Sequence, residues 1–581
     1  MALMMTFAAA AAFTPNTTVN TSSGAVRGYI SDGVFTFRSI QYAQAPVGDL
    51  RWRPPQAVAP WSGVRDATKD GPGCPQKCGL PKGTCPPTID EACLTLNVFT
   101  AGLGGAPRSV LFFIHGGDFY QGYAGGELYD GSHFARDHNV VVVCIQYRLG
   151  ALGFLYSGPD SAKQFTGNFG LLDQRLALRW THANIGRFGG DPSQITLFGQ
   201  SAGAMSVACH MVMEESAALF ARAILQSEAF ALPFRRTKDY PTFTKDVAIK
   251  GGCSHPTSST PYEACMRQLS WPHVIDAQVP TQEAKAQLQP YLPKLNPASS
   301  LSLSRTVTLI QVAAQKDLLV ELGHLMTVFV PFSPVIGTAE LPEQPLEALA
   351  GGRWHDKPLV MGTVRQEGVL FLYEAFPRRE SALEEAALLS ATFGVRAAAA
   401  IHHQYPPTEH ETRSGDYHNH SAVITTDGLF HCAVRHAALL LATSKQRASD
   451  VFVYHFDHKF SFGKAAWTPK FTECIDAVCH SEELPYVFHT DVHAMLNVSF
   501  TPKEEVLSDA MQAHWASFAL RGKPLATWPR FGNATEIAMR FTTDESAAMG
   551  PEGRGVGSHV EEAAYRPKCR FWDRLGYNWP A

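Results

Sequence analysis

The sequence predicts an α/β protein in which helices cover both faces of a mostly parallel β-sheet. Short β-branched apolar runs alternate with stretches of helical pattern along the chain, which is typical of this class. The runs show little alternation of apolar and polar residues, as expected for strands that are buried on both faces. The 581 residues are 45% hydrophobic and 18% charged, so the chain can bury a large core.

Six apolar runs are predicted to be strands, and two of the stretches between them to be helices. The predicted strands are residues 110–114, 140–145, 195–198, 223–225, 358–361 and 451–456, and the predicted helices are residues 171–180 and 202–213. Residues 230–350 are rich in Pro and Ser and are interpreted as an insertion that caps the strand ends. A length prior of about 150 residues per domain suggests about four domains. Because no repeat or long linker divides the chain, we instead expect residues 14–581 to form a single domain.

Several features predict an exported protein. Residues 1–13 are apolar and rich in Ala and are interpreted as a secretory leader, although no Lys or Arg precedes them; a frayed Ala-rich terminus is the alternative. Candidate N-glycosylation sites begin at Asn16, Asn20, Asn419, Asn497 and Asn533. No apolar run reaches the roughly 18 residues of a membrane span. We therefore expect a secreted protein, extracellular or in the lumen of the secretory pathway.

The net charge of −4 argues against a nucleic-acid partner.

The sharpest local signal is Gly199-Gln200-Ser201-Ala202-Gly203, which joins a predicted strand to a predicted helix. The two glycines remove Cβ atoms that would block a tight strand-to-helix turn. Such a turn lifts the serine hydroxyl clear of the sheet, near a helix N-terminus. An ordinary turn is the alternative for an isolated motif. In this context, the motif predicts that Ser201 is a catalytic nucleophile.

A serine hydroxyl is a weak nucleophile, so it needs a base, an acid that orients the base, and donors for an oxyanion. The sequence His115-Gly116-Gly117-Asp118-Phe119 directly follows the strand predicted at residues 110–114. Its glycines let backbone N–H groups approach a substrate oxygen, and the residue after the nucleophile supplies another donor. We expect the oxyanion hole to consist of the N–H groups of Gly117, Asp118 and Ala202, supported by Gly116 and Gln200.

Several longer motifs resemble the type-B carboxylesterase and cholinesterase family. They occur in the family's order and cover nearly the whole chain after residue 24: FRSIQYA at residues 37–43, PVG at 46–48, EACLTLNV at 91–98, YRLG at 147–150, GNFGLLDQ at 167–174 and FGGDP at 188–192. The resemblance implies an α/β-hydrolase fold, with a mostly parallel sheet, flanking helices and large cap and gorge insertions. It also implies hydrolysis of carboxylic esters.

The resemblance further implies the other two members of a catalytic triad. The segment from Gly362 to Gly368 resembles the family's acid loop, which makes Glu367 the acid. The segment beginning Cys479-His480-Ser481 resembles its histidine loop, which makes His480 the base. The order Ser, Glu, His fits this fold. Ser227 resembles a serine that supports the triad from behind. Composition alone could not select His480 from 23 histidines.

The twelve cysteines are expected to form five disulfides. The resemblance implies Cys74–Cys93, Cys253–Cys265 and Cys432–Cys569, whereas proximity alone suggests Cys78–Cys85 and Cys474–Cys479. The last of these would brace the loop that carries His480. Cys144 and Cys209 are expected to be unpaired core residues.

No metal or organic cofactor is expected. A zinc site formed by Cys74, Cys78, Cys85 and Cys93 is the alternative to two disulfides, but extracellular cysteines usually pair. A cluster of histidines is interpreted as a polar loop rather than a metal site; its members are His402, His403, His410, His418 and His420.

Asp118 departs from the family pattern, which usually has Gly or Ala at this position. A carboxylate about 4 Å from an oxyanion opposes it by on the order of 4 kcal/mol at an effective dielectric near 20, or roughly a thousandfold in rate. Asp118 avoids this penalty if it points away, pairs with a cation or stays protonated. One hypothesis is that ester turnover is reduced or restricted to substrates that tolerate the carboxylate. Another is that Asp118 positions water against the covalent intermediate, including a phosphorylated serine.

Two further departures argue against a cholinesterase. Gln200 replaces an acidic residue that often precedes the nucleophile, and the loop between Cys74 and Cys93 has no aromatic residue to bind an ammonium group. The sequence therefore favours a serine carboxylester hydrolase that acts on a small-molecule or lipid-like ester.

The alternatives are a non-catalytic adhesion or binding protein on the same fold, which would typically have lost a triad residue, and a lipase that acts at lipid surfaces. The sequence does not predict an oligomeric state.

Overall fold

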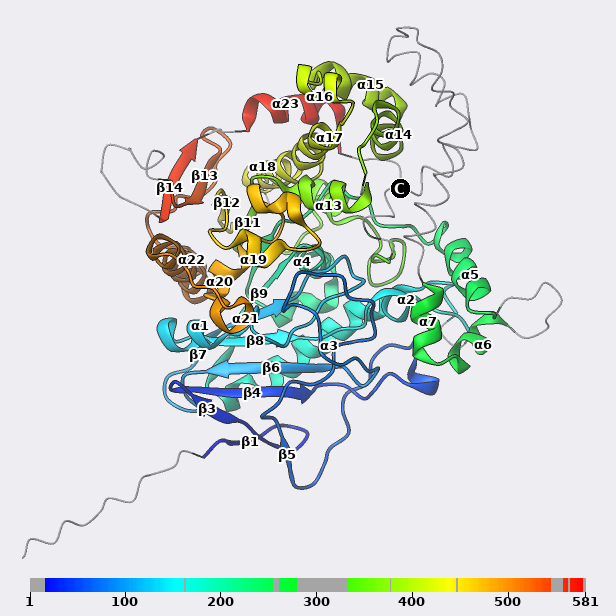
Figure 1. Ribbon diagram of the computed structural model, residues 1–581. Coiled ribbons are helices and arrows are strands. Elements are labelled where there is room, and N and C mark those ends of the chain that lie inside the picture. Colours follow the sequence, from blue (N-terminus) through cyan, green and yellow to red (C-terminus); the bar gives the residue numbers. More distant parts are fainter. Residues whose placement is uncertain are drawn as a thin grey trace, which may run out of the picture.

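A computed structural model confirms the α/β class and has an eleven-stranded mixed sheet at its centre (Figure 1). It describes residues 16–160, 163–253, 261–278, 330, 332–376, 378–445, 448–544, 557–562 and 565–577. The strand order is β14-β13-β12-β11-β10-β9-β7-β8-β6-β4-β3. Strands from β8 to β13 pair in parallel, and the outer pairs are antiparallel.

All six predicted strands are present in this sheet. In chain order its strands are β3 (Tyr29–Ser31), β4 (Val34–Gln41), β6 (Thr95–Thr100), β7 (Arg108–Ile114), β8 (Val141–Ile145), β9 (Gly190–Gln200), β10 (Arg222–Gln226), β11 (Leu359–Val364), β12 (Val451–Phe456), β13 (Ile537–Thr542) and β14 (Gly557–Glu562). A second sheet contains β1 (Thr18–Asn20), β2 (Ala25–Arg27) and β5 (Val64–Asp66). Strand β9 begins before its apolar run, because Gly190 pairs with Arg108 ahead of an irregularity in the ladder.

Each central strand directs alternate side chains to opposite faces of the sheet. In β7, Phe112 and Ile114 belong to one buried cluster, and Leu111 and Phe113 to the other. The first cluster includes side chains of α3 (Phe169–Asn184), α4 (Ala202–Val212) and α18 (Cys432–Thr443). The second includes side chains of α1 (Ser132–His138) and α22 (Pro502–Arg521). Burial on both faces explains why these strands have continuous apolar sequences.

The other helices connect the strands or lie above their carboxyl ends. They are η1 (Gly48–Leu50), α2 (Gly150–Phe154), η2 (Ile185–Phe188), η3 (Glu214–Leu219), α5 (Tyr240–Lys250), α6 (Tyr262–Gln268), α7 (Trp271–Ala277), α12 (Pro345–Ala350), α13 (Glu367–Ala375), α14 (Ala382–Phe393), α15 (Val395–Gln404), α16 (Glu409–Ser414), α17 (His418–Thr425), the π-helix η5 (Thr426–His431), α19 (Gly463–Trp467), η6 (Thr472–Asp476), α20 (Leu484–Phe488), α21 (Val492–Leu496) and α23 (Arg566–Leu575). Across the described residues, every helix is too short or too polar to cross a membrane.

Two predicted regions fall wholly or partly outside the described residues. The leader at residues 1–13 lies outside them entirely. Of the insertion at residues 230–350, the structure describes α5, α6, α7 and α12, whereas residues 254–260, 279–329 and 331 lie outside.

Ten cysteines form the five expected disulfides: Cys74–Cys93, Cys78–Cys85, Cys253–Cys265, Cys432–Cys569 and Cys474–Cys479. Cys144 and Cys209 are buried and unpaired. The zinc alternative is therefore wrong, because all four of its cysteines are consumed by the first two bonds and have no thiolate to offer.

The histidines expected in a polar loop lie instead on helices α15, α16 and α17. The loop prediction was wrong because a polar sequence is not always an exposed loop: His418 and His420 are buried on helix α17. The ring of His418 bonds Asp416 and a backbone carbonyl, and the ring of His420 contacts Glu385 and another carbonyl. Within the described residues, no three His, Cys, Asp or Glu side chains are arranged to hold a metal ion.

Candidate active site

Ser201 stands at the junction of β9 and α4 with φ 56° and ψ −126°. A non-glycine residue in such a conformation costs about 1–3 kcal/mol, so the surrounding structure must impose it. A Cβ atom at Gly203 would lie 2.0 Å from the carbonyl oxygen of Ile114, and one at Gly199 would lie 2.5 Å from the Gly203 carbonyl. The two glycines therefore let β7, β9 and α4 pack closely enough to hold the serine at a tight turn.

Glu367 and His480 meet in a buried hydrogen bond. Nδ1 of His480 lies 2.5 Å from Oε2 of Glu367. The other carboxylate oxygen accepts the backbone N–H of Val364 at 2.9 Å. Burial opposes the charged imidazolium, but the Glu367 carboxylate outweighs it and raises the pKa of His480. This arrangement keeps the proton on Nδ1 and leaves Nε2 as the proton-accepting nitrogen.

Backbone contacts join the loops of this acid and base. Gln366 and Cys479 form a parallel β-bridge, and the N–H of Gln366 donates to the carbonyl of Val478 at 3.0 Å. The Cys474–Cys479 disulfide closes the loop just before His480. The loop that carries the base is therefore held both to the acid loop and to itself.

Two phenylalanines pack against the imidazole of His480. The ring centroid of Phe371 lies 4.8 Å away, and that of Phe430 lies 5.6 Å away. Phe371 is one helical turn after Glu367 on α13, so this spacing could have indicated it from the sequence. Phe430 lies in the π-helix η5, a rare geometry that occurs often near functional sites. No signal in the sequence pointed to Phe430.

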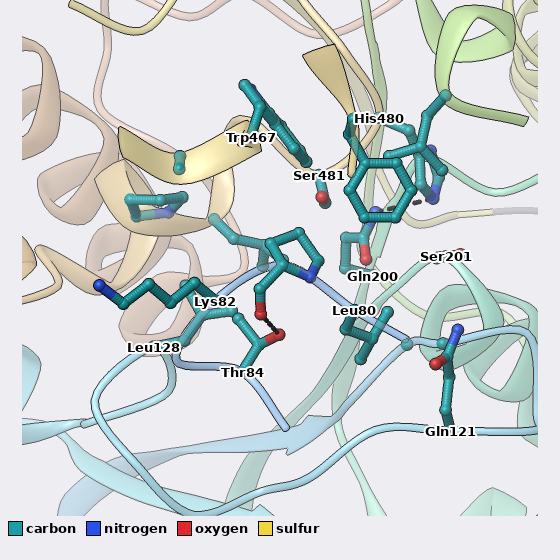
Figure 2. Close-up of a pocket in the computed structure, with 18 of the residues that line it drawn as sticks. Leu80, Lys82, Thr84, Gln121, Leu128, Gln200, Ser201, Trp467, His480 and Ser481 are labelled. Atoms are coloured by element: carbon teal, nitrogen blue, oxygen red, sulfur yellow. Dashed lines mark hydrogen bonds between the residues drawn. The ribbon is translucent and has the colours of Figure 1, made fainter. Parts of the chain in front are cut away.

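The remaining imidazole nitrogen faces Gln200 rather than Ser201. Nε2 of His480 lies 3.1 Å from the side-chain amide nitrogen of Gln200 (Figure 2). Ser201 and His480 line the same pocket but share no hydrogen bond. A proton transfer from Ser201 to this nitrogen would require the amide of Gln200 to move away; catalytic hydrogen bonds often tighten only when substrate binds.

The loop after β7 passes directly against the nucleophile. A Cβ atom at Gly116 would lie 3.0 Å from the Cβ of Ser201. Gly117 and Asp118 have φ values of 107° and 57°, and no acceptor among the described residues takes a hydrogen bond from their N–H groups. The N–H of Ala202 begins α4 and so has no partner within the helix. These three N–H groups are the available donors beside Ser201.

Asp118 lines two pockets that it shares with Ser201, and its carboxylate is close enough to His480 to act on the pKa of that imidazole. The nearby cation Lys470 pairs with Glu374 at 3.0 Å, and no described cation forms a salt bridge with Asp118. Burial and then the Glu374 carboxylate raise the pKa of Asp118 to about 7, partly offset by His480 and Lys470. Of the three ways to avoid the charge penalty, the raised pKa favours protonation, which would dominate below neutral pH. The Glu374–Lys470 pair gave no signal in the sequence.

Ser201 lies between two pockets of unequal size. The larger has an empty volume of about 930 Å³ and is lined mainly by apolar side chains: Leu80, Leu128, Leu370, Phe371, Phe460, Phe462, Ala466, Trp467, Phe471, Leu484, Pro485, Met495 and Leu496. The smaller, of about 390 Å³, is lined by Met205, Ala229, Leu232, Val330, Phe371, Leu429 and Phe430 and by Ser227. The buried hydroxyl of Ser227 has no partner among the described residues. The arrangement suits a molecule with two apolar arms that meet at Ser201.

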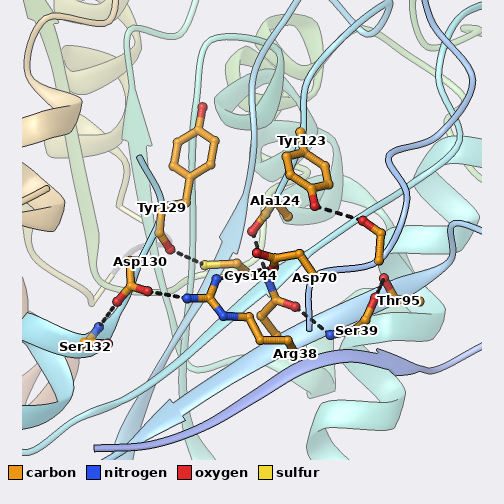
Figure 3. Close-up of polar contacts among 12 residues, drawn as sticks. Arg38, Ser39, Asp70, Thr95, Tyr123, Ala124, Tyr129, Asp130, Ser132 and Cys144 are labelled. Carbon is orange, nitrogen blue, oxygen red and sulfur yellow. Dashed lines mark hydrogen bonds and ion pairs between the residues drawn. The ribbon is translucent and has the colours of Figure 1, made fainter. Parts of the chain in front are cut away.

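A buried ion-pair network supports the wall of the larger pocket (Figure 3). Arg38 of β4 lies 2.6 Å from Asp130 and 3.3 Å from Asp70. Asp130 also accepts the backbone N–H of Ser132 at 2.9 Å. Because Asp130 directly follows Tyr129, which lines the pocket, the network fixes this wall to the sheet.

Comparisons with known proteins extend over nearly the whole chain. Residues 15–572 match the model of the carboxylesterase family. The crystal protein of Dictyostelium discoideum is 31% identical over 569 residues, 96% of this chain and 90% of the relative. The para-nitrobenzyl esterase of Bacillus subtilis strain 168 is 31% identical over 541 residues, 92% of this chain and 96% of the relative. The solved structure of a Geobacillus stearothermophilus carboxylesterase has a TM-score of 0.69 and 28% identity, covering 96% of this chain and 100% of that one.

Proposed function

The chain belongs to the carboxylesterase family and is a hydrolase of carboxylic esters, and we propose that it works through an acyl-enzyme on Ser201. The observation that carries this proposal is the 2.5 Å contact between His480 and Glu367, in a pocket shared with a serine held at a strained turn. This combination supplies an oriented base in the same pocket as the nucleophile.

In the first half-reaction, Nε2 of His480 takes the proton of the Ser201 hydroxyl as Oγ attacks the ester carbonyl carbon. The N–H groups of Gly117, Asp118 and Ala202 bind the oxygen that becomes negative. The imidazolium then gives its proton to the leaving alcohol oxygen, and the carbon–oxygen bond breaks. Glu367 holds the imidazole tautomer and stabilises the imidazolium. The acyl group remains on Ser201.

In the second half-reaction, water replaces the alcohol. Nε2 takes a proton from the water as its oxygen attacks the acyl carbon, and the same N–H groups bind the oxyanion. The imidazolium returns the proton to Oγ, and the acid is released. The cycle ends with the free enzyme, so atoms and charge balance.

Labelling with a fluorophosphonate probe tests the nucleophile. We expect the purified protein to be labelled at Ser201 and Ser201→Ala to remain unlabelled. Ser193→Ala removes an exposed serine from the same strand and is the matched control, with labelling unchanged. A wild-type protein that resists the probe, or a Ser201→Ala protein that is labelled equally, contradicts the proposal.

The unequal pockets support esters with one large and one small apolar arm. A panel of neutral chromogenic esters, varied first in the acyl group and then in the alcohol, tests this. We expect kcat/KM to rise with size on one side only and to fall when both groups are large. Equal tolerance of bulk on both sides contradicts the pocket assignment.

No observation favours the alternative functions. A non-catalytic binding protein does not explain why the buried acid and base meet beside the serine. Lys82, rather than an aromatic residue, stands at the wall formed by the loop between Cys74 and Cys93, and its charge would repel a cationic substrate. The wall therefore supports a neutral ester as substrate.

We also propose that the protein is exported and glycosylated. Its five disulfides favour an oxidising compartment. All five candidate acceptors, Asn16, Asn20, Asn419, Asn497 and Asn533, are exposed. Expression in eukaryotic cells should yield protein in the medium whose mass falls on enzymatic deglycosylation. Retention of unglycosylated protein inside the cells contradicts this proposal.

A further inference from the structure

The side chain of Asp118 has a role beyond that of its backbone N–H, and this inference rests on the proposed function. We propose that the site hydrolyses esters only when Asp118 is in its neutral acid form, which makes Asp118 a catalytic residue that limits turnover at alkaline pH.

Asp118 and Ser201 line the same two pockets, and the Asp118 carboxylate is close enough to His480 to act on the pKa of that imidazole. The backbone of Asp118 belongs to the loop that packs against Ser201. The left-handed φ of 57° is held by the turn in which Tyr120 and Gln121 donate to the carbonyl of Gly117. A charge on Asp118 is therefore close to His480 and to the two pockets that share Ser201, where the oxyanion would form.

Among the described residues, no cation forms a salt bridge with the Asp118 carboxyl, although His480 and Lys470 partly offset its raised pKa. Glu374 of α13 adds a second carboxylate. Lys470, before η6, bonds Glu374 at 3.0 Å and the carbonyl of Gly79 at 2.7 Å. Tyr147, after β8, donates its hydroxyl to the carbonyl of His115 at 2.9 Å. On the wall opposite, Lys82 is exposed.

His480 is the remaining charged group that faces Asp118. Because Lys470 is already engaged, burial dominates and holds the pKa of Asp118 near 7. In return, the Asp118 carboxylate helps to raise the pKa of His480. The two groups therefore titrate as a pair.

The pair is active when it holds a single titratable proton and that proton is on Asp118, so that Asp118 is a neutral acid and His480 is a neutral base. The neutral acid presents an O–H donor and no charge, in the manner of a buried carboxylic acid kept neutral to stabilise an oxyanion. At lower pH, His480 becomes protonated and is no longer a base. At higher pH, Asp118 ionises and repels the oxyanion. The rate should therefore peak near neutral pH and fall on both sides.

The experiment measures kcat/KM between pH 5 and 9 by titrating the acid released from a neutral ester. The wild-type rate should fall above neutral pH by about tenfold per pH unit until a residual rate is reached. Asp118→Asn keeps the shape and the left-handed turn but cannot ionise. It should lose the alkaline limb and keep its acid limb near the wild-type position, because Asp118 is already neutral in the pH range where His480 becomes protonated.

Two further variants sharpen the test. Glu374→Gln removes a charge that raises the pKa of Asp118, so the alkaline limb should move to lower pH. Asp137→Asn changes an exposed carboxylate on α1 and should leave the profile unchanged. If Asp118→Asn melts far below wild type, Asp118→Gly carries the same test, since glycine also accepts the left-handed turn.

An alkaline limb that persists in Asp118→Asn overturns the inference. Fluorophosphonate labelling at pH 6 separates this result from failure of the proposed function. If Ser201 is labelled but wild type and Asp118→Asn have identical pH profiles, only the role of Asp118 is contradicted. If the protein is never labelled, the proposed nucleophile is contradicted.

Discussion

At the scale of single residues, the site depends on backbone conformations that side chains rarely adopt. Ser201, Asp118 and Ser481 have φ values of 56°, 57° and 77°. Asp118 stands where the family pattern usually has Gly or Ala, and its left-handed φ shows why glycine suits this position. Each such residue costs about 1–3 kcal/mol, so the packed core around the site must offset the strain.

The two glycines of the turn give a stability prediction. Gly203→Ala should lower the free energy of unfolding by about 3 kcal/mol and reduce labelling of Ser201, because its Cβ would lie 2.0 Å from a backbone oxygen. Thermal melts and probe labelling measure both effects. Gly186→Ala is the matched control, since a Cβ there meets nothing within 4 Å. Equal melting of the two variants would show that β7 and α4 are less tightly packed than described.

At the scale of elements, neighbouring parallel strands bring the proposed catalytic groups together at their carboxyl ends. Strand β7 leads to the oxyanion loop, β9 to Ser201 and β11 to Glu367. These strands lie close together in the order β11-β10-β9-β7. His480 does not follow one of these strands directly. It lies on a loop that is joined to the Glu367 loop by the β-bridge between Gln366 and Cys479. The sheet therefore positions Ser201 and Glu367, and the loop that carries Glu367 positions His480.

Sequence reasoning succeeded where the signal is local. The strands are continuous apolar runs, and the serine turn is fixed by two glycines within five residues. Glu367 and His480 came from the family resemblance, since nothing near them in the chain distinguishes them chemically. The Gln200–His480 contact joins residues 280 apart and the Glu374–Lys470 pair joins residues 96 apart. Such pairings depend on packing of distant segments, which has no local pattern.

The ion-pair network below the pocket gives a prediction for β4. Arg38→Met should lower the free energy of unfolding by about 3 kcal/mol, because it leaves Asp130 largely buried without its cation. The wall at Tyr129 should loosen, and KM should rise more than kcat falls. Denaturant unfolding and ester kinetics measure these effects.

The matched control for Arg38 is Arg27→Met. Arg27 pairs with Asp66 at 3.7 Å, and its side chain is 60% exposed, so this change should shift stability by less than about 0.5 kcal/mol. Similar losses in both variants would mean that the buried network does not brace the wall.

At the scale of the whole molecule, one disulfide joins the C-terminal helix α23 to helix α18 beside the central sheet. Cys432 of α18 and Cys569 of α23 are separated by 137 residues. Trp572 of the same helix is fully buried and donates to the hydroxyl of Tyr405 at 2.8 Å. The last helix is therefore part of the core rather than an appendage.

Loop entropy predicts how much this bond contributes. Replacing Cys432 and Cys569 by serine should lower the free energy of unfolding by about 5 kcal/mol, against about 2.4 kcal/mol for Cys78 and Cys85, which are 7 residues apart. Denaturant unfolding of the two double variants measures the difference. The second pair should affect substrate binding more, since its loop lines the larger pocket. An inverted order of stability would contradict the entropic account.

Under the proposed mechanism, the order of the three catalytic groups along the chain determines when a newly made molecule becomes active. A polypeptide that has emerged from the ribosome through α13 contains the proposed nucleophile and acid but not the base. The imidazole of His480 joins them only after a later segment has been synthesised and has folded back against the acid loop. On this mechanism the partly made chain is inactive, and hydrolytic activity begins only at a late stage of folding.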